Sequence, residues 1–317
     1  MSNSLMVTGA SGFIGQELCE ELIRRQHSVK TIVRDESKIK DIRYLNAKVA
    51  DIGPETNWVS ALQDIDVVVH LAARVHIMKD KAFDPLEAFR KVNTAGTLNL
   101  ARQAAAAGVK RFVFVSTIKV NGDVTMPGRP FRADDVPVPL DPYAVSKLEA
   151  EQSLRELEAQ TGMEVVIVRP PLVYGPGVGA NFASMMRWVA RGVPLPLGAI
   201  NNSRSLVALG NLVDLLVTCL KHPAAAGQTF LVSDGEDVST SELLSRTAQA
   251  MDRKVMLLPI PTFLLEAGAA LLGKRTVAQR LCGSLQVDIE KTRYLLDWNP
   301  PYTLNQGLKR TVEGTNM

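Results

Sequence analysis

The sequence predicts an α/β fold, in which a doubly wound parallel sheet is combined with a smaller, interleaved C-terminal unit. Short apolar runs of β-type residues alternate with longer helical patterns through the first half of the chain, as in repeated βαβ units. A glycine-rich segment joins the first of these runs to the first helical pattern. After Arg169 the alternation stops, and prolines and glycines cluster. These three observations indicate one parallel sheet followed by a differently built unit.

The alternating elements can be placed one after another along the chain. The expected strands are at residues 5–7, 29–33, 66–70, 112–116 and 165–168. The expected helices are at residues 15–25, 90–107 and 143–161. The strands are almost continuously apolar, which is typical of parallel strands covered by helices on both faces. An apolar run at 206–220 and a helical pattern at 242–251 follow in the C-terminal part.

Composition and charge place the chain among ordinary globular proteins. Of its 317 residues, 46% are hydrophobic and 22% are charged, proportions that leave no case for global disorder. The 36 basic and 33 acidic residues are scattered along the chain, so a nucleic-acid-binding surface is not expected. Three widely separated cysteines, Cys19, Cys219 and Cys282, predict neither a disulfide framework nor a metal site. This cysteine pattern favours a reducing cytoplasm.

One late stretch, residues 263–272, is strongly apolar. It contains Glu266 and is far shorter than the roughly 20 residues that a membrane span requires. We therefore expect no membrane span. Of the two remaining interpretations, a buried helix is favoured over a membrane-surface helix.

Glycines at three-residue spacing follow the first expected strand and open the first expected helix. A turn without β-carbons lets the backbone approach a pyrophosphate, and a helix N-terminus offers free N–H groups and a partial positive charge. A merely tight turn would use the same residues, but the position between a strand and an amphipathic helix favours dinucleotide binding. The segment is Thr8-Gly9-Ala10-Ser11-Gly12-Phe13-Ile14-Gly15.

This turn makes the predicted sheet one of the Rossmann type and divides the chain. We expect residues 1–170, together with roughly residues 205–235, to form the NAD(P)-binding domain. Residues 171–204 and 236–317 are expected to form the substrate-binding domain.

A tyrosine and a lysine share one face at the start of an expected helix. Tyr143 and Lys147 are four residues apart, a spacing that places both on one side of a helix. A phenol has a pKa near 10, and a neighbouring ammonium group would lower it and make proton exchange with an alcohol or carbonyl practical. Thr117 follows the preceding expected strand, where its hydroxyl could hydrogen-bond the reacting oxygen or only satisfy backbone groups. We expect all three residues to be catalytic.

The end of the second expected strand bears on the choice of cofactor. Arg34 could hold the 2′-phosphate of NADP(H) through a fork-like contact. Alternatively, Arg34 is a solvated surface charge and Asp35 binds the ribose of NAD(H). NADP(H) is favoured, and NAD(H) stays open.

Taken together, these motifs resemble the extended short-chain dehydrogenase/reductases, the NAD-dependent epimerase/dehydratase family, over nearly the whole chain. The resemblance implies that Thr117 assists Tyr143, and that Asn181 and Arg204 contact a nucleotide-sugar substrate, Arg204 at its diphosphate. A surface position is the alternative for Arg204. Family members are often dimers, which allows a homodimer here. The residues that the resemblance assigns to the cofactor, besides the glycine turn and the Tyr143–Lys147 pair, are Asp51, Ile52, Leu71, Ala72, Ala73, Asn93, Ser116, Pro170 and Val173.

Departures from the family pattern narrow the expected activity. In the family's sugar dehydratases an Asp and a Glu follow the catalytic threonine, but here those places hold Ile118 and Lys119. Neither can supply the acid and base of an elimination, so a dehydratase is excluded. Asn121 stands where a tyrosine is common, which argues against a close match to the galactose epimerases.

The resemblance then leaves three enzymatic interpretations. The favoured one is reduction of a UDP-linked 4-keto-6-deoxy-N-acetylhexosamine for surface polysaccharides. The alternatives are a UDP-hexose or UDP-N-acetylhexosamine 4-epimerase with tightly held NAD, and an NADPH-dependent ketone reductase of the flavonoid or steroid type. A cofactor-sensing module is disfavoured because it would not need Tyr143 and Lys147.

Overall fold

The computed structural model describes residues 4–33, 45–49, 51–75, 84–126, 128–273 and 275–314. Its central feature is a seven-stranded sheet of order β3-β2-β1-β4-β5-β6-β9. Every neighbouring pair in this sheet is parallel, which confirms the predicted doubly wound architecture. The strands are β1 (Ser4–Thr8), β2 (Ser28–Val33), β3 (Leu45–Lys48), β4 (Val67–His70), β5 (Arg111–Val115), β6 (Glu164–Arg169) and β9 (Thr229–Leu231).

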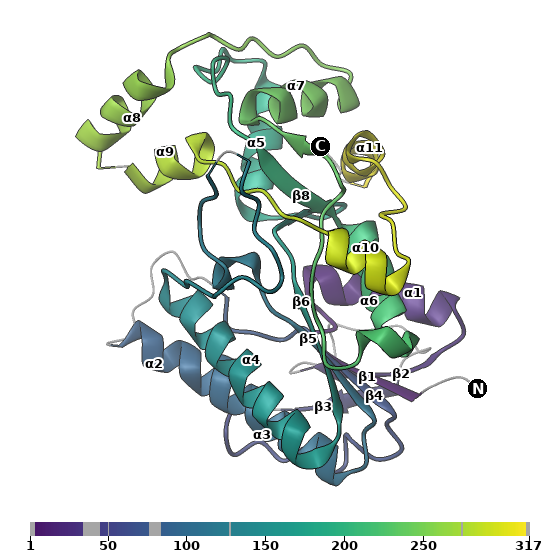
Figure 1. The fold of residues 1–317 in the computed structure, drawn as a ribbon. Coiled ribbons are helices and arrows are strands. Elements are labelled where there is room, and N and C mark those ends of the chain that lie inside the picture. Colours follow the sequence, from purple (N-terminus) through teal and green to yellow (C-terminus); the bar gives the residue numbers. More distant parts are fainter. Residues whose placement is uncertain are drawn as a thin grey trace.

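Helices cover both faces of this sheet, as Figure 1 shows. One face carries α1 (Phe13–Arg24) and α6 (Leu209–Lys221), and the other carries α3 (Thr97–Ala106) and α4 (Pro142–Thr161). Successive residues of β1 alternate between the two cores, since Leu5 and Val7 belong to one core and Met6 to the other. This period of two explains why the strands are apolar at nearly every position.

The strand order reverses at β1, with β2 on one side and β4 on the other. Ligands of open α/β sheets bind outside the carboxyl ends of the strands at such a reversal. Here the segments that leave those ends begin with Gly9 after β1, Leu71 after β4, Ser116 after β5 and Pro170 after β6. The predicted cofactor and catalytic motifs are therefore brought to one edge of the sheet.

The connection from β4 to β5 differs from the single helix predicted at residues 90–107. It consists of α2 (Pro85–Phe89), a π-helical segment η2 (Arg90–Gly96) and then α3. The hydrophobic pattern of α-helix and π-helix is too similar for a short π segment to be detected in sequence. Such segments are frequent at functional sites, and η2 carries the buried Asn93.

The second unit is built around a small sheet of order β10-β8-β7. The expected return segment, residues 205–235, is divided between the sheets, because β8 joins the small sheet and β9 completes the large one. The strands are β7 (Leu172–Tyr174), β8 (Arg204–Ala208) and β10 (Asp237–Val238). The remaining segments are η4 (Pro223–Ala225) and the helices α5 (Ala180–Arg191), α7 (Thr240–Ala250), α8 (Thr262–Leu271), α9 (Arg275–Cys282), α10 (Glu290–Leu296) and α11 (Leu304–Glu313).

The prediction of a buried helix at residues 263–272 is wrong. The helix α8 forms, but none of its residues is buried, and with α9 it projects from the edge of the molecule in Figure 1. An apolar composition predicts that a helix packs against another apolar surface. It does not predict that this surface belongs to the same chain. Among the described residues, no helix combines the length and the apolar character needed to cross a membrane.

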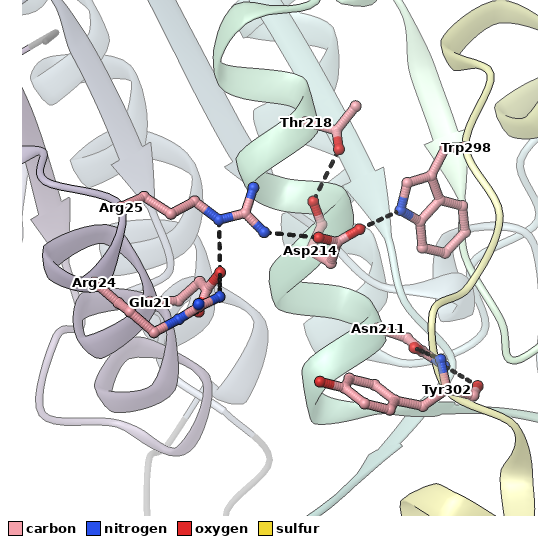
Figure 2. Close-up of polar contacts among 8 residues, drawn as sticks. All are labelled: Glu21, Arg24, Arg25, Asn211, Asp214, Thr218, Trp298 and Tyr302. Carbon is pink, nitrogen blue, oxygen red and sulfur yellow. Dashed lines mark hydrogen bonds and ion pairs between the residues drawn. The ribbon is translucent and has the colours of Figure 1, made fainter.

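Polar contacts join α1, α6 and the C-terminal segment on one face of the large sheet (Figure 2). One oxygen of Asp214 accepts a hydrogen bond from Arg25 at 2.8 Å, and the other accepts one from the Trp298 indole at 2.9 Å. Trp298 is only 4% exposed. Nearby, Asn211 exchanges two hydrogen bonds with the backbone of Tyr302, each 2.8 Å long. Asp214 thus ties the late segment to the first helix.

Replacing Asp214 by alanine is expected to lower the free energy of unfolding by about 1–3 kcal/mol, because the buried Trp298 indole loses its acceptor. Chemical denaturation measures the change. Alanine at the exposed Glu20 of α1 removes a carboxylate without this bond and is the matched control. Equal effects of the two substitutions would contradict the assignment.

Candidate active site

The turn after β1 requires glycine because of its backbone conformation and its close contacts with neighbouring backbone atoms. Gly9 has a φ of +72°, and a β-carbon there would lie 2.8 Å from the backbone nitrogen of Ala72. A β-carbon on Gly15 would lie 2.1 Å from the Gly9 carbonyl oxygen. The first glycine therefore allows the turn to approach the neighbouring segment, and the third allows α1 to pack against the turn. Gly12 closes the turn by donating its N–H to the Gly9 oxygen at 2.9 Å.

The N-terminus of α1 is suited to an anionic group. Its N-cap residue, Gly12, makes no side-chain capping bond, and the first turn contains no acidic residue. Ser11 and Gly12 are exposed, whereas Phe13 and Ile14 are half-buried. The uncapped N–H groups and the helix dipole both favour a phosphate at this position. The residues present thus fit a dinucleotide pyrophosphate.

The segment after β4 is held by a buried histidine. His70 lies between two hydroxyls, with Thr8 Oγ1 2.7 Å from Nδ1 and Thr97 Oγ1 2.9 Å from Nε2. Burial, reinforced by the Lys147 charge, lowers the pKa of His70 to about 3, so the ring is neutral. The Thr8 hydroxyl also accepts the Ala72 N–H at 3.3 Å. Leu71, Ala72 and Ala73 are thereby fixed, half-buried, beside the glycine turn.

The carboxyl ends of β5 and β6 contribute Ser116 and Pro170, and Val173 follows in β7. The Ser116 hydroxyl is buried and has no hydrogen-bond partner among the described residues, a rare condition for a native protein. A polar ligand atom could satisfy it, which again fits a bound cofactor. Pro170 accepts the Ile118 N–H at 3.0 Å through its carbonyl, and Val173 lies half-buried in β7.

Tyr143 lies in the first turn of α4, which begins where the sequence predicts. Asp141 caps the helix by accepting the Ala144 N–H at 2.8 Å, and Pro142 occupies the first helical position. Thr117 precedes the short 3₁₀ segment η3 (Ile118–Val120) and accepts the Lys119 N–H at 3.4 Å. The Tyr143 ring is partly buried and packs edge-on against Phe89 at 6.0 Å.

The pKa values of Tyr143 and Lys147 differ from the expectation that the lysine lowers the pKa of the phenol. The pKa of Tyr143 is raised to about 12, first by burial and then by the Asp141 charge. Burial lowers the pKa of Lys147 to about 7, against an opposing effect of Glu151, and its Nζ lies 3.9 Å from the centre of the Phe114 ring. A buried lysine with so low a pKa is a weak source of positive charge, so in this arrangement it does not outweigh the burial of the phenol.

Asn93, which the resemblance assigns to the cofactor, contacts protein groups in the structure. Its Oδ1 accepts the Arg74 N–H at 2.8 Å, and its Nδ2 donates to the Arg74 carbonyl and to the Ser146 hydroxyl, each at 3.0 Å. The Ser146 hydroxyl donates in turn to the Tyr143 carbonyl at 2.7 Å. Asn93 therefore links the segment after β4 to the helix that carries Tyr143 and Lys147.

A buried ion pair lies next to the lysine. Arg169 and Glu151 form a bidentate pair, and both side chains are almost fully buried. Arg169 also donates to Asn121 Oδ1 at 3.0 Å, while Asn121 donates to the Arg132 carbonyl at 2.8 Å. Sequence reasoning noticed Asn121 only as a departure from the family. The structure shows that it completes the hydrogen bonding of a buried guanidinium group.

Lys119, the cation that replaces a dehydratase acid, has a defined partner. Its Nζ forms a short ion pair with Asp141 and lies 3.7 Å from Asp123. The Asp141 carboxylate caps the helix of Tyr143 and raises the pKa of the Tyr143 phenol. Lys119 partly neutralises this carboxylate and so reduces its effect on the phenol. No sequence signal pointed to this role.

Replacing Lys119 by methionine is expected to shift the ascending limb of the pH–activity profile to higher pH. Without the cation, the Asp141 charge disfavours the phenolate more strongly. We expect about a 3- to 10-fold loss of kcat at neutral pH, recovered in part at higher pH. The control is Asp123→Asn, which removes the more distant acid. An unshifted limb in a folded variant would refute this role of Lys119.

The tyrosine after Val173 has a structural role in the described arrangement. The Tyr174 hydroxyl donates to Asp234 at 2.7 Å and its ring stacks on Phe182 at 5.4 Å. Burial raises the pKa values of both Tyr174 and Asp234. A β-carbon on Gly307 would lie 2.4 Å from the Tyr174 hydroxyl, so α11 packs directly against this group.

Arg204 lies at the start of β8, where its Nη1 donates to the carbonyls of Arg280 at 2.8 Å and Gly283 at 3.1 Å. Among the described residues it has no acidic partner within ion-pair distance, and burial lowers the pKa of its guanidinium. Asn181 is in the first turn of α5, but its side chain lies outside the described part.

The adenosine end of the predicted cofactor site is only partly described. Asp51 is exposed and accepts the Ile52 N–H at 2.8 Å, and Ile52 approaches Gly96 of η2. Arg34 and Asp35 lie outside the described residues.

Fold and site together define a nicotinamide-dependent enzyme of the short-chain dehydrogenase/reductase type. The chain belongs to the NAD dependent epimerase/dehydratase family, whose model matches residues 5–233. It is 49% identical over 315 residues to UDP-glucose 4-epimerase of Vibrio cholerae, covering 99% of this chain and 95% of the relative.

Two solved structures share the fold along almost the whole chain. UDP-glucuronic acid 4-epimerase from Bacillus cereus in complex with NAD has a TM-score of 0.78 and 21% identity, with 98% of both chains covered. RMD from Pseudomonas aeruginosa complexed with NADPH has a TM-score of 0.74 and 24% identity, with 99% of both chains covered. At these identities the similarity concerns the fold alone.

Proposed function

We propose that the chain is a UDP-hexose 4-epimerase that retains NAD(H). The observation that carries this proposal is the grouping of Tyr143 and Thr117 with the glycine turn at one edge of the sheet, without an acid–base pair for elimination. Ile118 is buried and aliphatic, and Lys119 is bound to Asp141. The site therefore supports proton and hydride exchange at a carbinol carbon, but no dehydration.

The residues act on the oxygen of the reacting carbon. A bound nicotinamide supplies the hydride acceptor and donor. Tyr143 removes the proton from the C4 hydroxyl as the sugar is oxidised and returns it on reduction. In this proposal Thr117 hydrogen-bonds the same oxygen, and Lys147, with a pKa of about 7, holds a cation near the phenol during part of the cycle.

The relative from Vibrio cholerae supports the epimerase better than the 4-ketoreductase that the sequence placed first. The same relative favours NAD(H), whereas the sequence favoured NADP(H) on the basis of Arg34. An epimerase uses its cofactor in both directions and has no need to release it. Tight retention is therefore the property that distinguishes it from a reductase.

A 4-ketoreductase acting on a UDP-linked 4-keto-6-deoxy-N-acetylhexosamine is the second candidate. Asn121 favours it, because this residue replaces the tyrosine common in galactose epimerases and is bound to Arg169. The substrate would then arrive already oxidised at C4.

A nucleotide-linked substrate is supported by Arg204. Its guanidinium lacks an acidic partner among the described residues, although the side chain is half-buried and burial lowers its pKa. Burying a cation without a counter-charge is costly. A substrate diphosphate would supply the missing negative charge, which is the role that we propose for it.

Two measurements on the purified protein test these proposals. We expect denaturation to release NAD(H) in stoichiometric amount, and incubation with UDP-glucose or UDP-N-acetylglucosamine to yield the C4 epimer, detected by NMR. Protein that releases no cofactor, is inert towards both sugars and oxidises NADPH with a UDP-4-keto-6-deoxy sugar would instead be the reductase.

A further inference from the structure

The α8–α9 hairpin, residues 262–282, exposes large apolar side chains along α8 and directly after it. Phe263 is 67% exposed, Leu271 89% and Leu272 74%. Phe263, Ala267 and Leu271 follow one another at four-residue spacing and therefore share one face of α8. Large apolar side chains that are exposed together are a feature of interaction sites.

The charge of this region points to an anionic partner. The hairpin contains three basic residues and one acidic residue, a net charge of +2, and Arg253 and Lys254 precede it, whereas the whole chain has a net charge of +3. The rest of the protein is thus close to neutral. On α9, Arg275 and Arg280 are exposed, and no ion pair is found for either within the described part of the chain.

The base of the hairpin is connected to the candidate substrate site. Arg204 donates to the carbonyls of Arg280 and Gly283 at the end of α9. Figure 1 shows α8 and α9 projecting from the unit that contains β8, away from the large sheet. A surface bound by the hairpin would therefore lie on the substrate side of the molecule.

We propose that the α8–α9 hairpin docks on the surface of an anionic phospholipid bilayer. Phe263, Leu271 and Leu272 enter the boundary between headgroups and acyl chains, and Arg275 contacts lipid phosphates. Apolar residues combined with basic ones are what an interfacial helix requires, and α8 is too short to span a bilayer. A second copy of the chain fits less well, because a two-fold contact through the hairpin would bring two segments of net charge +2 together.

Vesicle sedimentation tests the proposal with the full chain. We expect the protein to pellet with vesicles of phosphatidylglycerol and phosphatidylethanolamine, but not with phosphatidylcholine alone, and to be released by salt. The double variant Leu271→Asp, Leu272→Asp should lose this binding. The matched control is Val136→Asp, a substitution at a residue 82% exposed outside the hairpin, and it should bind as wild type does.

A charge variant and a mass measurement complete the test. Arg275→Gln is expected to weaken binding to anionic vesicles about fivefold, while Arg102→Gln on α3, also exposed, should not. Failure of the wild type to bind, unchanged binding of the double variant, or equal loss with Val136→Asp would each overturn the proposal. So would a dimer in light scattering that the double variant converts to a monomer. Vesicle binding needs no sugar, so its outcome is independent of the proposed epimerase activity.

Discussion

Replacing Tyr143 by phenylalanine should lower kcat by about 10²- to 10⁴-fold while the protein stays folded and binds its cofactor. The ring is retained, so its contact with Phe89 is preserved. The Tyr143 hydroxyl makes no hydrogen bond to another described residue, and its removal leaves no protein group without a partner. The loss would therefore report the chemistry of the phenol rather than a change in stability.

Tyr174 supplies the matched control, because its hydroxyl, unlike that of Tyr143, is hydrogen-bonded within the protein. Tyr174→Phe removes the donor to Asp234, a buried carboxyl group. This variant should lose stability, by about 1–3 kcal/mol, and retain kcat. Turnover of sugar by Tyr143→Phe at near the wild-type rate, measured by NMR, would show that another group carries the proton.

Replacing Lys147 by methionine should abolish most activity and at the same time stabilise the protein near neutral pH. Lys147 is fully buried, and this burial disfavours its charged form and lowers its pKa to about 7. Methionine has a similar length and needs no hydration in this position. At pH 7 we expect a gain in the free energy of unfolding on the order of 1–4 kcal/mol.

The gain should depend on pH in a defined direction. Between pH 7 and the ordinary lysine pKa of 10.5, the unfolded wild-type chain binds a proton that the folded chain does not. Wild-type stability therefore rises with pH across this window relative to the variant. The difference between the two proteins should be largest at pH 7 and shrink towards pH 10.5.

Chemical denaturation at pH 7 and pH 9.5 measures this difference. A difference that stays constant over the window would mean that Lys147 keeps its ordinary pKa in the folded state. Activity distinguishes the functional role, because the stabilised variant should be nearly inactive on the nucleotide sugar.

The parallel sheet and the grouping of its motifs could be predicted from the sequence because both depend on local patterns. The apolar run of β1 and the glycines at 9, 12 and 15 predict a strand, a turn and the start of a helix within a dozen residues. Tyr143 and Lys147 are one helical turn apart. Parallel strands then bring these segments to one edge without further information.

What could not be predicted depends on partners that are distant in sequence. Asn121 is bound to Arg169, 48 positions away, and Lys119 to Asp141, 22 positions away. Neither pairing has a local pattern. The low pKa of Lys147 follows from burial under elements that only the folded chain supplies. The exposure of α8 was mispredicted because apolar residues alone do not reveal whether a helix is covered.

The late position of β9 has a consequence for how the protein is made. The large sheet ends with β9, which pairs with β6 although β7, α5, β8 and α6 separate the two strands in the chain. During synthesis, β6 leaves the ribosome some sixty residues before its neighbour, and its edge stays unpaired in the interval. An open edge on an apolar strand invites association with other chains. Fragments that end near residue 170 should therefore aggregate, and pauses in translation between β6 and β9 should lower the yield of folded protein.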